Sequence, residues 1–262
     1  MKILVLNAGS SSQKSRLYEI ANTAALPDLA PTPLWQVDAD WTHQQGTTEL
    51  KISIVSGIVL QENLRTDVCS EVIRHILKTL WSGKTQIIAQ ASEIDIVGYR
   101  VVHGGREFEK SILVTPEVKE AISRMAVLAP AHNPANLEGI EVIARILPAV
   151  PQVAVFDTAF HRKMPLPAIV YPGPYEWFEQ GIHRYGFHGI SHHYCAQHAA
   201  QVLSRDLQSL RLITCHLGND CSLAAIRYGH SVETTMGFTF LEGLMMGSRS
   251  GSVDFGILFY LL

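Results

Sequence analysis

The sequence predicts an α/β protein built from two related halves, and two observations support this prediction. Two short apolar runs, residues 3–6 and 212–215, are each followed by a small polar turn and by a returning strand. Between these two units, apolar strands alternate with segments at helical spacing such as residues 66–81. Because the two strand–turn–strand units share one design, they indicate an internal structural duplication. We therefore expect two α/β domains, residues 1–150 and residues 151–262.

The composition is that of a globular protein with ample material for a core. The chain has 262 residues, of which 47% are hydrophobic and 17% are charged, and its formal net charge is −3. The sequence contains no long basic run, which argues against nucleic acid as the main partner. The longest apolar run, residues 255–262, is far too short to span a bilayer, so no membrane partner is expected.

The cysteines and the N-terminus favour a cytoplasmic location. Cys69, Cys195, Cys215 and Cys221 are scattered and form no Cys-x-x-Cys pair, so reduced thiols are their simplest account. The chain enters a strand at once, without the charged, apolar and small segments of a signal peptide. We therefore expect a cytoplasmic protein.

The first polar turn has the composition of a phosphate-binding turn. Asn7, Ser10, Ser12 and Lys14 supply a carboxamide, two hydroxyls and a positive charge. Such a turn can direct backbone N–H groups and hydroxyl donors at a phosphate. The second turn, residues 216–222, is again small, polar and glycine-containing. Taken alone, each turn is explained slightly better as an ordinary hairpin bend, because Asn, Gly and Ser favour turns, and neither is a Walker A loop.

Three further segments can carry function. The strand at residues 94–99 delivers Arg100 and then a Gly-Gly bend, which fits an anion site as well as an ordinary strand end. The strand at residues 153–156 ends at Asp157, and acids at the carboxyl ends of buried strands often carry function in α/β proteins. Arg249 lies in a loop rich in Gly, Met and hydroxyls, from which an arginine can swing onto developing phosphoryl charge.

Helices are predicted in both halves. Residues 116–128 form one, and a second begins where Asn133 and Pro134 fit an N-cap and a first helical position. A third helix follows residues 184–192 and runs to about residue 204.

Seven stretches, taken together, resemble the acetate kinase family of the acetate and sugar kinase/Hsp70/actin superfamily. They are residues 4–14, 98–105, 128–134, 155–161, 184–192, 216–222 and 236–254. These stretches follow the family order from one end of the chain to the other, and seven ordered motifs are far more specific than any single one. The resemblance implies a ribonuclease H-like (actin-like ATPase) fold with two related α/β domains.

The resemblance also implies reversible phosphoryl transfer from ATP to acetate, which gives ADP and acetyl phosphate. It implies Mg²⁺ and ATP as the required cofactors, and a homodimer. In-line transfer needs little covalent help and much positive charge around the three equatorial oxygens. Acetate is already ionised at pH 7, so no strong general base is required. Propionate or another short acid is the alternative substrate.

The matching positions imply a set of site residues. The implied catalytic residues are Asp157, His188 and Arg249, of which the last two would stabilise the transition state. The implied nucleotide site comprises Ser10, Ser12, Lys14, His216, Leu217, Gly218, Asn219 and Asp220, and Asn7 would help to place Mg²⁺ and phosphate. The implied acetate site comprises Arg100, which would bind the carboxylate, and Val102, Ala131, Phe187 and Phe240, which would surround the methyl group. For Asp157 we favour an orienting or metal-linked role over that of a general base.

Four positions depart from the family pattern. Asp220 stands where the pattern has glycine, Phe240 and Phe255 where it has proline, and Ile190 where it has threonine. Asp220 adds a negative charge beside phosphates, and at ~4 Å this repulsion is ~1 kcal/mol in water and ~4 kcal/mol near a protein surface. Phe240 would shrink or reshape the acetate pocket.

The chain also ends earlier than the family pattern. Family members continue well past Leu262, so we expect an incomplete second domain that lacks the adenosine pocket and a Mg²⁺-ligating glutamate. A short helix is expected to begin at Asp254 and to stop after about two turns. Its apolar residues 257–262 are expected to lie exposed without a partner layer.

Two classes of function remain open. The first is an acetate kinase whose activity in this chain is undecided, favoured by the retained catalytic residues. The second is a non-catalytic remnant that binds a small carboxylate or phosphate, or a chain that needs a partner to supply the remaining part. A Ser-His-Asp hydrolase is poorly supported, because the sequence has no Gly-x-Ser-x-Gly motif.

Overall fold

The computed structural model describes residues 1–9, 12–21 and 31–262. The chain divides into two compact units. Unit 1 consists of Met1–Val102 and Ser111–Val155, and unit 2 consists of His103–Lys110 and Phe156–Leu262. The domain boundary between residues 150 and 151 stays a prediction.

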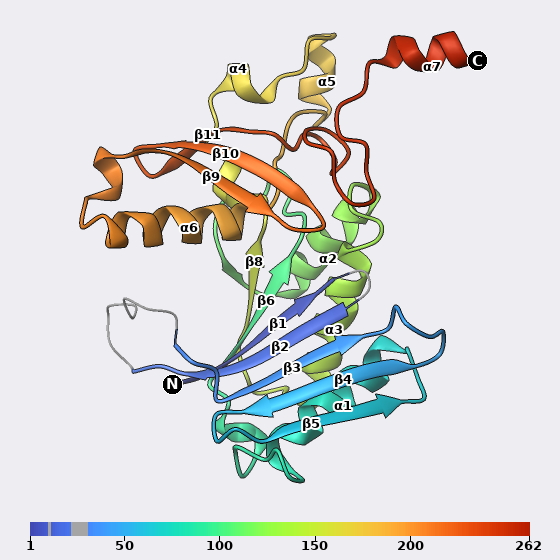
Figure 1. Ribbon diagram of the computed structural model, residues 1–262, viewed down its shortest axis with the longest axis vertical. Coiled ribbons are helices and arrows are strands. Elements are labelled where there is room, and N and C mark those ends of the chain that lie inside the picture. The colour runs from blue at the N-terminus through green and yellow to red at the C-terminus, as the bar shows by residue number, and fades with distance from the viewer. Residues whose placement is uncertain (10–11, 22–30) are drawn as a thin grey trace. The chain divides into compact units, whose positions relative to one another are not determined.

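Unit 1 is built on a mixed sheet with the strand order β5-β4-β3-β2-β1-β6-β8-β7 (Figure 1). The strands are β1 (Lys2–Ala8), β2 (Ser12–Glu19), β3 (Trp35–Asp40), β4 (Thr48–Ile54), β5 (Val59–Leu64), β6 (Ile96–Val101), β7 (Ile112–Leu113) and β8 (Gln152–Phe156). β1 pairs antiparallel with β2, as the first strand–turn–strand unit predicts, and parallel with β6. The parallel pairing brings the carboxyl ends of β1 and β6 to the same edge of the sheet.

Helices cover one face of this sheet. They are α1 (Cys69–Trp81) and α3 (Asn133–Ile146), with α2 (Pro116–Arg124) and the short 3₁₀ turns η1 (Ala91–Glu93) and η2 (Met125–Val127). The apolar residues of α1 recur at helical spacing and are buried, which places its inner stripe in the core. Trp35 of β3 is fully buried, and its indole Nε1 donates to the Thr79 hydroxyl of α1 at 3.2 Å.

Two of these helices begin elsewhere than the sequence predicts. The N-cap position of α3 is His132, without a side-chain capping bond, and Asn133 is the first helical residue, so Asn133 as the N-cap is wrong. The Asn133 carboxamide instead donates to the Ile122 carbonyl of α2 at 3.1 Å, which ties the two helices together. α1 begins at Cys69, three residues later than predicted, and the carbonyl of Thr66 accepts from the Thr48 hydroxyl at 2.7 Å.

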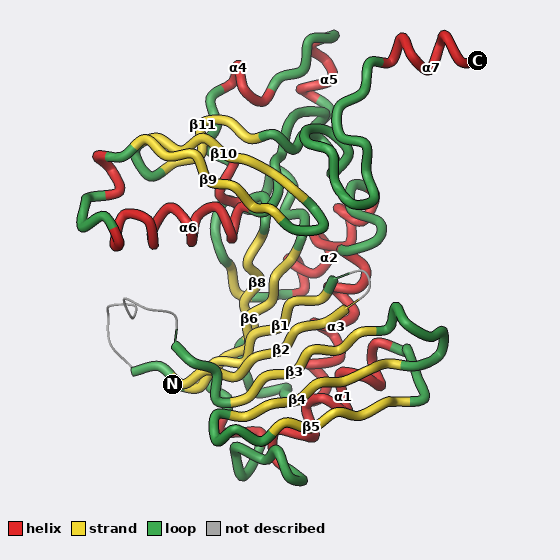
Figure 2. Tube along the Cα trace, in the orientation of Figure 1, coloured by secondary structure: helices red, strands yellow, loops and turns green. Residues whose placement is uncertain are grey.

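Unit 2 contains a three-stranded antiparallel sheet in the order β11-β10-β9. Its elements are β9 (Arg211–Leu217), β10 (Cys221–Arg227), β11 (His230–Thr234), α4 (Leu166–Ile169), α5 (Tyr175–Glu179), α6 (Gly189–Val202), α7 (Phe255–Leu261) and the 3₁₀ turns η3 (Ala159–His161) and η4 (Leu207–Ser209). The β9–β10 hairpin confirms the second strand–turn–strand unit. α6 lies along β9, and residues 235–254 form neither helix nor strand (Figure 2).

The helix α7 has no covering layer among the described residues. Its N-cap is Asp254, whose carboxylate accepts from the Gly256 N–H at 2.8 Å. Phe259 and Tyr260 are 81% and 89% exposed, as the sequence predicts for this segment. Within the described ranges, no helix combines the length and the apolar character that a membrane span requires.

We predict that Gly139→Ala stabilises the chain. Gly139 lies in the middle of α3, and a Cβ there would meet only Ile73 Cδ1 of α1, at an ordinary contact distance of 3.7 Å. Because alanine is the better helix former, the free energy of unfolding is expected to rise by up to about 1 kcal/mol. Urea denaturation followed by circular dichroism measures this change.

The neighbouring Ile140→Ala is the control. Ile140 is fully buried, so this truncation is expected to lower the free energy of unfolding by about 2–5 kcal/mol. A loss of stability in Gly139→Ala would contradict the described spacing of α1 and α3.

Candidate functional site

The edge of the unit 1 sheet holds a carboxamide between two cationic side chains. Asn7 at the end of β1 is paired with Lys14 of β2 on one side and with Arg100 of β6 on the other. Directly paired residues share one face of a sheet. Arg100 Nη1 donates to Asn7 Oδ1 at 3.2 Å. Two positive charges and a carboxamide on one face have the chemistry to bind an anion.

The turn between β1 and β2 is closed by its backbone. The Gly9 N–H donates to the Ser12 carbonyl at 2.8 Å, which brings the half-buried Ser12 to the start of β2. Ser10, which the family resemblance assigns to the nucleotide site, lies outside the described residues.

Asn136 of α3 contacts the backbone at the same edge of the sheet. The sequence did not predict this residue as part of the site. Its Oδ1 accepts from the Val102 N–H at 3.1 Å, and its Nδ2 donates to the Ala8 carbonyl at 3.1 Å. One buried carboxamide therefore joins the ends of β1 and β6, which carry Asn7 and Arg100. Val102 is fully buried beside it, while Ala131 is exposed in the connection between α2 and α3.

In unit 2, a close backbone approach brings Asp157 and His188 near each other. The buried Asp157 follows β8, and its carbonyl accepts from the Gly189 N–H at 2.8 Å. A Cβ at Gly189 would lie 2.2 Å from that carbonyl oxygen, so only glycine permits the approach. His188, with a left-handed φ of 58°, directly precedes α6.

Two histidines of unit 2 stack on one another. The rings of His188 and His216 lie 4.0 Å apart at an interplanar angle of 23°. His188 Nδ1 is 2.9 Å from the Ser222 hydroxyl, and His216 Nδ1 is 2.9 Å from the Ser191 hydroxyl. Each ring is therefore oriented through Nδ1 by a serine.

Two further buried histidines support this pair. Burial, together with the neighbouring histidines and against the opposing charge of Asp157, lowers the pKa of His192 to about 3. Burial also lowers the pKa of His161 to about 4, against the Phe187 carbonyl and Asp157, which raise it. Both imidazoles are therefore neutral at pH 7 and act as hydrogen-bonding groups.

Arg249 lies against the second polar turn. Its Nη1 forms an ion pair with Asp220 Oδ1 at 2.6 Å, and its guanidinium lies 5.4 Å from the centre of the Phe240 ring. The Phe240 ring in turn packs against that of Phe187, with centroids 4.0 Å apart. Asp220 and Phe240 both depart from the family pattern, and both contact the arginine that the pattern makes catalytic.

One backbone hydrogen bond joins the loop that carries Arg249 to this turn, and another closes the turn itself. The Gly247 N–H donates to the Asn219 carbonyl at 2.9 Å, and the Gly218 N–H donates to the Asp220 carbonyl at 3.0 Å. Leu217, Gly218 and Asn219 form the exposed tip of the β9–β10 hairpin.

The predicted site residues therefore fall into two groups. Unit 1 carries Asn7, Ser12, Lys14, Arg100, Val102 and Ala131, and unit 2 carries Asp157, Phe187, His188, His216, Leu217, Gly218, Asn219, Asp220, Phe240 and Arg249. In unit 1, strand pairing and a hydrogen bond link Asn7, Lys14 and Arg100. In unit 2, His188 stacks on His216 and Arg249 pairs with Asp220. A methyl pocket walled by all four predicted apolar residues stays a prediction, because two belong to each unit.

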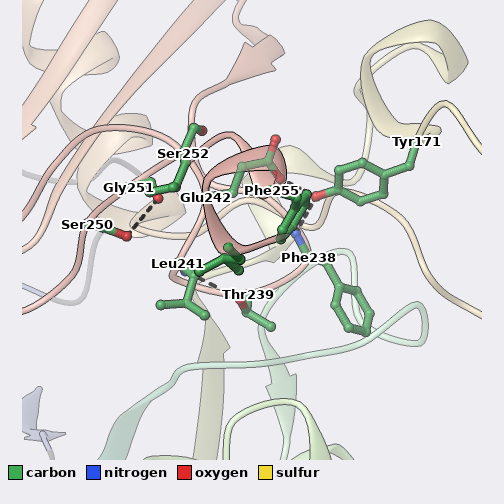
Figure 3. Close-up of a pocket in the computed structure, with 11 residues that line it drawn as sticks. Tyr171, Phe238, Thr239, Leu241, Glu242, Ser250, Gly251, Ser252 and Phe255 are labelled. Atoms are coloured by element: carbon green, nitrogen blue, oxygen red, sulfur yellow. Dashed lines mark hydrogen bonds between the residues drawn. The ribbon is translucent and has the colours of Figure 1, made fainter. Parts of the chain in front are cut away.

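A separate cavity of about 660 Å³ lies in unit 2 between the loop that follows β11 and α7 (Figure 3). None of the predicted site residues lines it. Its acid, Glu242, accepts from Arg184 Nη2 at 2.6 Å and from the Tyr171 hydroxyl, so the charge of Glu242 is already paired. The cavity is therefore distinct from the two groups of predicted site residues.

The described residues do not form a closed metal site. No three His, Cys, Asp or Glu side chains of residues 1–9, 12–21 and 31–262 come together as a metal-binding group. Asn7 Oδ1, expected to help place Mg²⁺, accepts from Arg100. Mg²⁺ is commonly held by one or two protein carboxylates, water and substrate phosphates, so the ion would be bound chiefly by a nucleotide.

The chain is similar along its whole length to known acetate kinases. The sequence model of the acetokinase family matches residues 2–262. Curated acetate kinases from Cyanothece sp. and Gloeobacter violaceus are 64% and 60% identical over 262 and 263 residues, which is 100% of this chain. The chain spans 64% of the length of these relatives.

Solved structures give the same result. The acetate kinase of Porphyromonas gingivalis superposes with a TM-score of 0.87 at 40% identity, over 99% of this chain and 63% of that one. The propionate kinase of Francisella tularensis gives 0.85 at 37% identity, over 99% and 63%. The predicted ribonuclease H-like, actin-like ATPase fold is confirmed by these neighbours.

We predict that Asp220→Asn tightens the binding of inorganic phosphate. The substitution keeps the side-chain size but removes the charge that pairs with Arg249, whose side chain is 22% exposed. At a partly exposed site, one unit of charge near phosphate is worth about 1 kcal/mol, so the dissociation constant should fall about fivefold. Isothermal titration with phosphate at low salt measures the effect.

Asp206→Asn, at the N-cap of the η4 turn, is the matched control and should leave phosphate binding unchanged. Weaker binding in Asp220→Asn would mean that Asp220 orients Arg249 for the anion instead of competing with it.

Proposed function

Because this chain belongs to the acetokinase family, we propose that it carries catalytic residues of an ATP-dependent acetate kinase. The reaction transfers a phosphoryl group from ATP to acetate and gives ADP and acetyl phosphate. The observation that best supports this proposal is the position of Arg249, 2.6 Å from the second polar turn and on the same unit as the stacked pair His188 and His216.

The chemistry fits this set of residues. A carboxylate oxygen of acetate attacks the γ-phosphorus in line, while the bond from that phosphorus to the β–γ bridging oxygen breaks and its electron pair leaves with ADP. No proton has to be removed, because acetate is ionised at pH 7. The demand on the protein is for donors and positive charge around the three equatorial oxygens, which Arg249 and His188 are proposed to supply.

The edge of unit 1 is proposed to hold the substrates. Arg100 would bind the acetate carboxylate, and Lys14 with Ser10 and Ser12 would bind nucleotide phosphates. The side chain of Asn7, already hydrogen-bonded to Arg100 at 3.2 Å, would keep that guanidinium in place. The second turn, His216 to Asp220, would contact phosphates from unit 2.

Acetate is proposed as the preferred acid over propionate. Phe240 stands where the family pattern has proline, and its ring packs on Phe187 at 4.0 Å. Beside these two packed rings, a methyl group would be accommodated more readily than an ethyl group.

Asp157 is proposed to orient the reacting groups. Its carboxyl is buried, and its backbone is fixed to the start of α6 by the 2.8 Å bond from Gly189. Mg²⁺ would enter as its complex with ATP and would supply charge neutralisation of the phosphates when bound. Asn7 and Asp157 are the oxygen donors that this chain offers to it, and no step of the proposal depends on the ion.

A non-catalytic role is the second candidate, and one observation favours it. Asp220 already pairs with Arg249, so the arginine is engaged in the ligand-free chain. A chain of this kind would bind a small carboxylate or phosphate without turnover, or would need a partner chain. For either role, a homodimer and a cytoplasmic location are also proposed. The location is supported by the free thiols of Cys69, Cys195, Cys215 and Cys221.

The decisive experiment is acetyl-phosphate formation. Purified chain is incubated with acetate and Mg-ATP, and the product is trapped with hydroxylamine. We expect turnover that Arg249→Ala reduces at least about 100-fold, because the loss of a transition-state charge contact costs about 3 kcal/mol.

Arg227→Ala, an exposed arginine at the end of β10, is the matched control and should keep the activity. Folded wild-type protein without turnover would contradict the kinase proposal and leave the non-catalytic role.

A further inference from the structure

The loop that carries Arg249 is closed at its base. The Gly243 N–H donates to the Ser252 hydroxyl at 3.0 Å, and the Ser252 N–H donates to the Gly243 carbonyl at 2.9 Å. Residues 243–252 therefore form a compact surface loop whose two ends are joined, and we call it the arginine loop. Because its ends are joined, the position of the whole loop depends on what holds residue 243.

Contacts within the arginine loop and at its tip tie Arg249 to the loop backbone. The Met246 N–H donates to the Arg249 carbonyl at 2.9 Å, and Met246 Sδ lies 3.9 Å from Arg249 Nη1. The Gly247 N–H donates to the Asn219 carbonyl at 2.9 Å, but both of these residues are exposed. Because water competes for exposed hydrogen bonds, the tip alone fixes the loop only weakly.

Glu242, directly before the arginine loop, is held by two side chains. Its carboxylate accepts from Arg184 Nη2 at 2.6 Å and from the Tyr171 hydroxyl (Figure 3). The side chains of Arg184 and Glu242 are 18% and 31% exposed, so their ion pair is partly shielded from water. Hydrogen bonds between charged groups are stronger than those between neutral groups. The base of the loop is therefore fixed more firmly than its tip.

The segment before Glu242 surrounds the same two side chains. Arg184 Nη1 donates to the carbonyls of residues 234–236 at distances of 3.2–3.4 Å. The Tyr171 hydroxyl accepts from the Phe238 N–H at 2.7 Å. A Cβ at Gly237 would displace that hydroxyl and the carboxylate beside it. The whole approach to the arginine loop therefore depends on one guanidinium and one phenol.

The Tyr171 hydroxyl stays protonated and so acts as a donor. Burial and the hydrogen bond to Glu242 raise the pKa of the phenol, against the Phe238 N–H and Arg184, which lower it. The hydroxyl can donate to Glu242 while its oxygen accepts from Phe238. Removing the carboxylate would take away the acceptor of both this proton and Arg184 Nη2.

We propose that Glu242 and Tyr171 are positioning residues that hold the arginine loop, and with it Arg249, against the second polar turn. The functional consequence rests on the proposed phosphoryl transfer, in which Arg249 supplies charge to the transition state. An arginine whose loop is already fixed loses less freedom when it meets a phosphoryl group, so less binding energy is spent on ordering it.

The test is the mobility of the Arg249 side chain in the ligand-free full chain, read as the ¹⁵N order parameter of its Nε–H bond. Wild type should lie above about 0.6 and folded Glu242→Ala below it. The amides of Gly247 and Ser252 should exchange with solvent about tenfold faster in this variant, because a hydrogen bond to a charged group is lost.

Glu233→Ala is the matched control. Glu233 pairs with the same Arg184, but at 3.8 Å and through a side chain that is 56% exposed. Because Glu233 lies in β11 and not at the base of the loop, its removal should leave Arg249 and the two amides unchanged.

Tyr171→Phe is the second variant, and it serves if Glu242→Ala does not fold. It removes only the hydroxyl and should also increase the mobility of Arg249. Its control is Tyr185→Phe, because the Tyr185 hydroxyl donates to the Gly181 carbonyl at 3.0 Å and not to Glu242.

The proposal is overturned if wild-type Arg249 is as mobile as in the variants. It is also overturned if folded Glu242→Ala and Tyr171→Phe both keep the wild-type order parameter and exchange rates. The measurement needs no substrate, so it tests the proposal in a chain without turnover. A kinase-active chain whose variants keep Arg249 ordered would refute this inference and leave the proposed function standing.

Discussion

The backbone bond between Gly189 and Asp157 is the constraint on which the site in unit 2 depends. It joins the end of β8 to the start of α6 at 2.8 Å, a distance that a side chain at residue 189 would forbid. His188 stands just before this point and stacks on His216. His192, four residues later, comes one helical turn along α6 and reaches both Thr214 and Ser222. One close approach therefore sets the acid, the stacked pair and the hydrogen bonds of His192.

In each unit, the oxygen of a polar side chain accepts a hydrogen bond from an arginine. In unit 1, a carboxamide at the end of the first strand, Asn7, holds Arg100. In unit 2, a carboxylate in the second turn, Asp220, holds Arg249. Each arginine is thus oriented before an anion arrives, which lowers the cost of ordering it. The carboxylate differs from the carboxamide because it neutralises its arginine as well as orienting it.

The sequence was sufficient where a local pattern decides the structure. Both hairpins follow from an apolar run, a polar turn and an alternating return, and the inner stripe of α1 follows from helical spacing. β5 was not predicted, because it is an edge strand whose exposed and half-exposed residues give no buried pattern. The N-cap of α3 was wrong because a contact with α2 outcompetes the local capping role of Asn133.

In the site, the sequence could not supply contacts between distant residues. Asn136 looks like an ordinary helical residue until it is seen to join Ala8 and Val102. The sequence predicted Asp220 only as a repulsive charge, and the structure adds its pairing with Arg249, which lies far along the chain. The contacts of His192 with Ser222 and Thr214 likewise depend on α6 lying along β9, which no local pattern reveals.

The central claim is that unit 2 presents a preformed anion site at His188, His216 and Arg249. The most direct measurement is a titration with inorganic phosphate while the imidazole ¹⁵N resonances are recorded. We predict saturable shifts of both His188 and His216, lost together in Arg249→Ala, with no shift of His75 of unit 1, whose ring is paired with Glu62. Resonances of His188 and His216 that do not respond to phosphate in the folded chain would contradict the account.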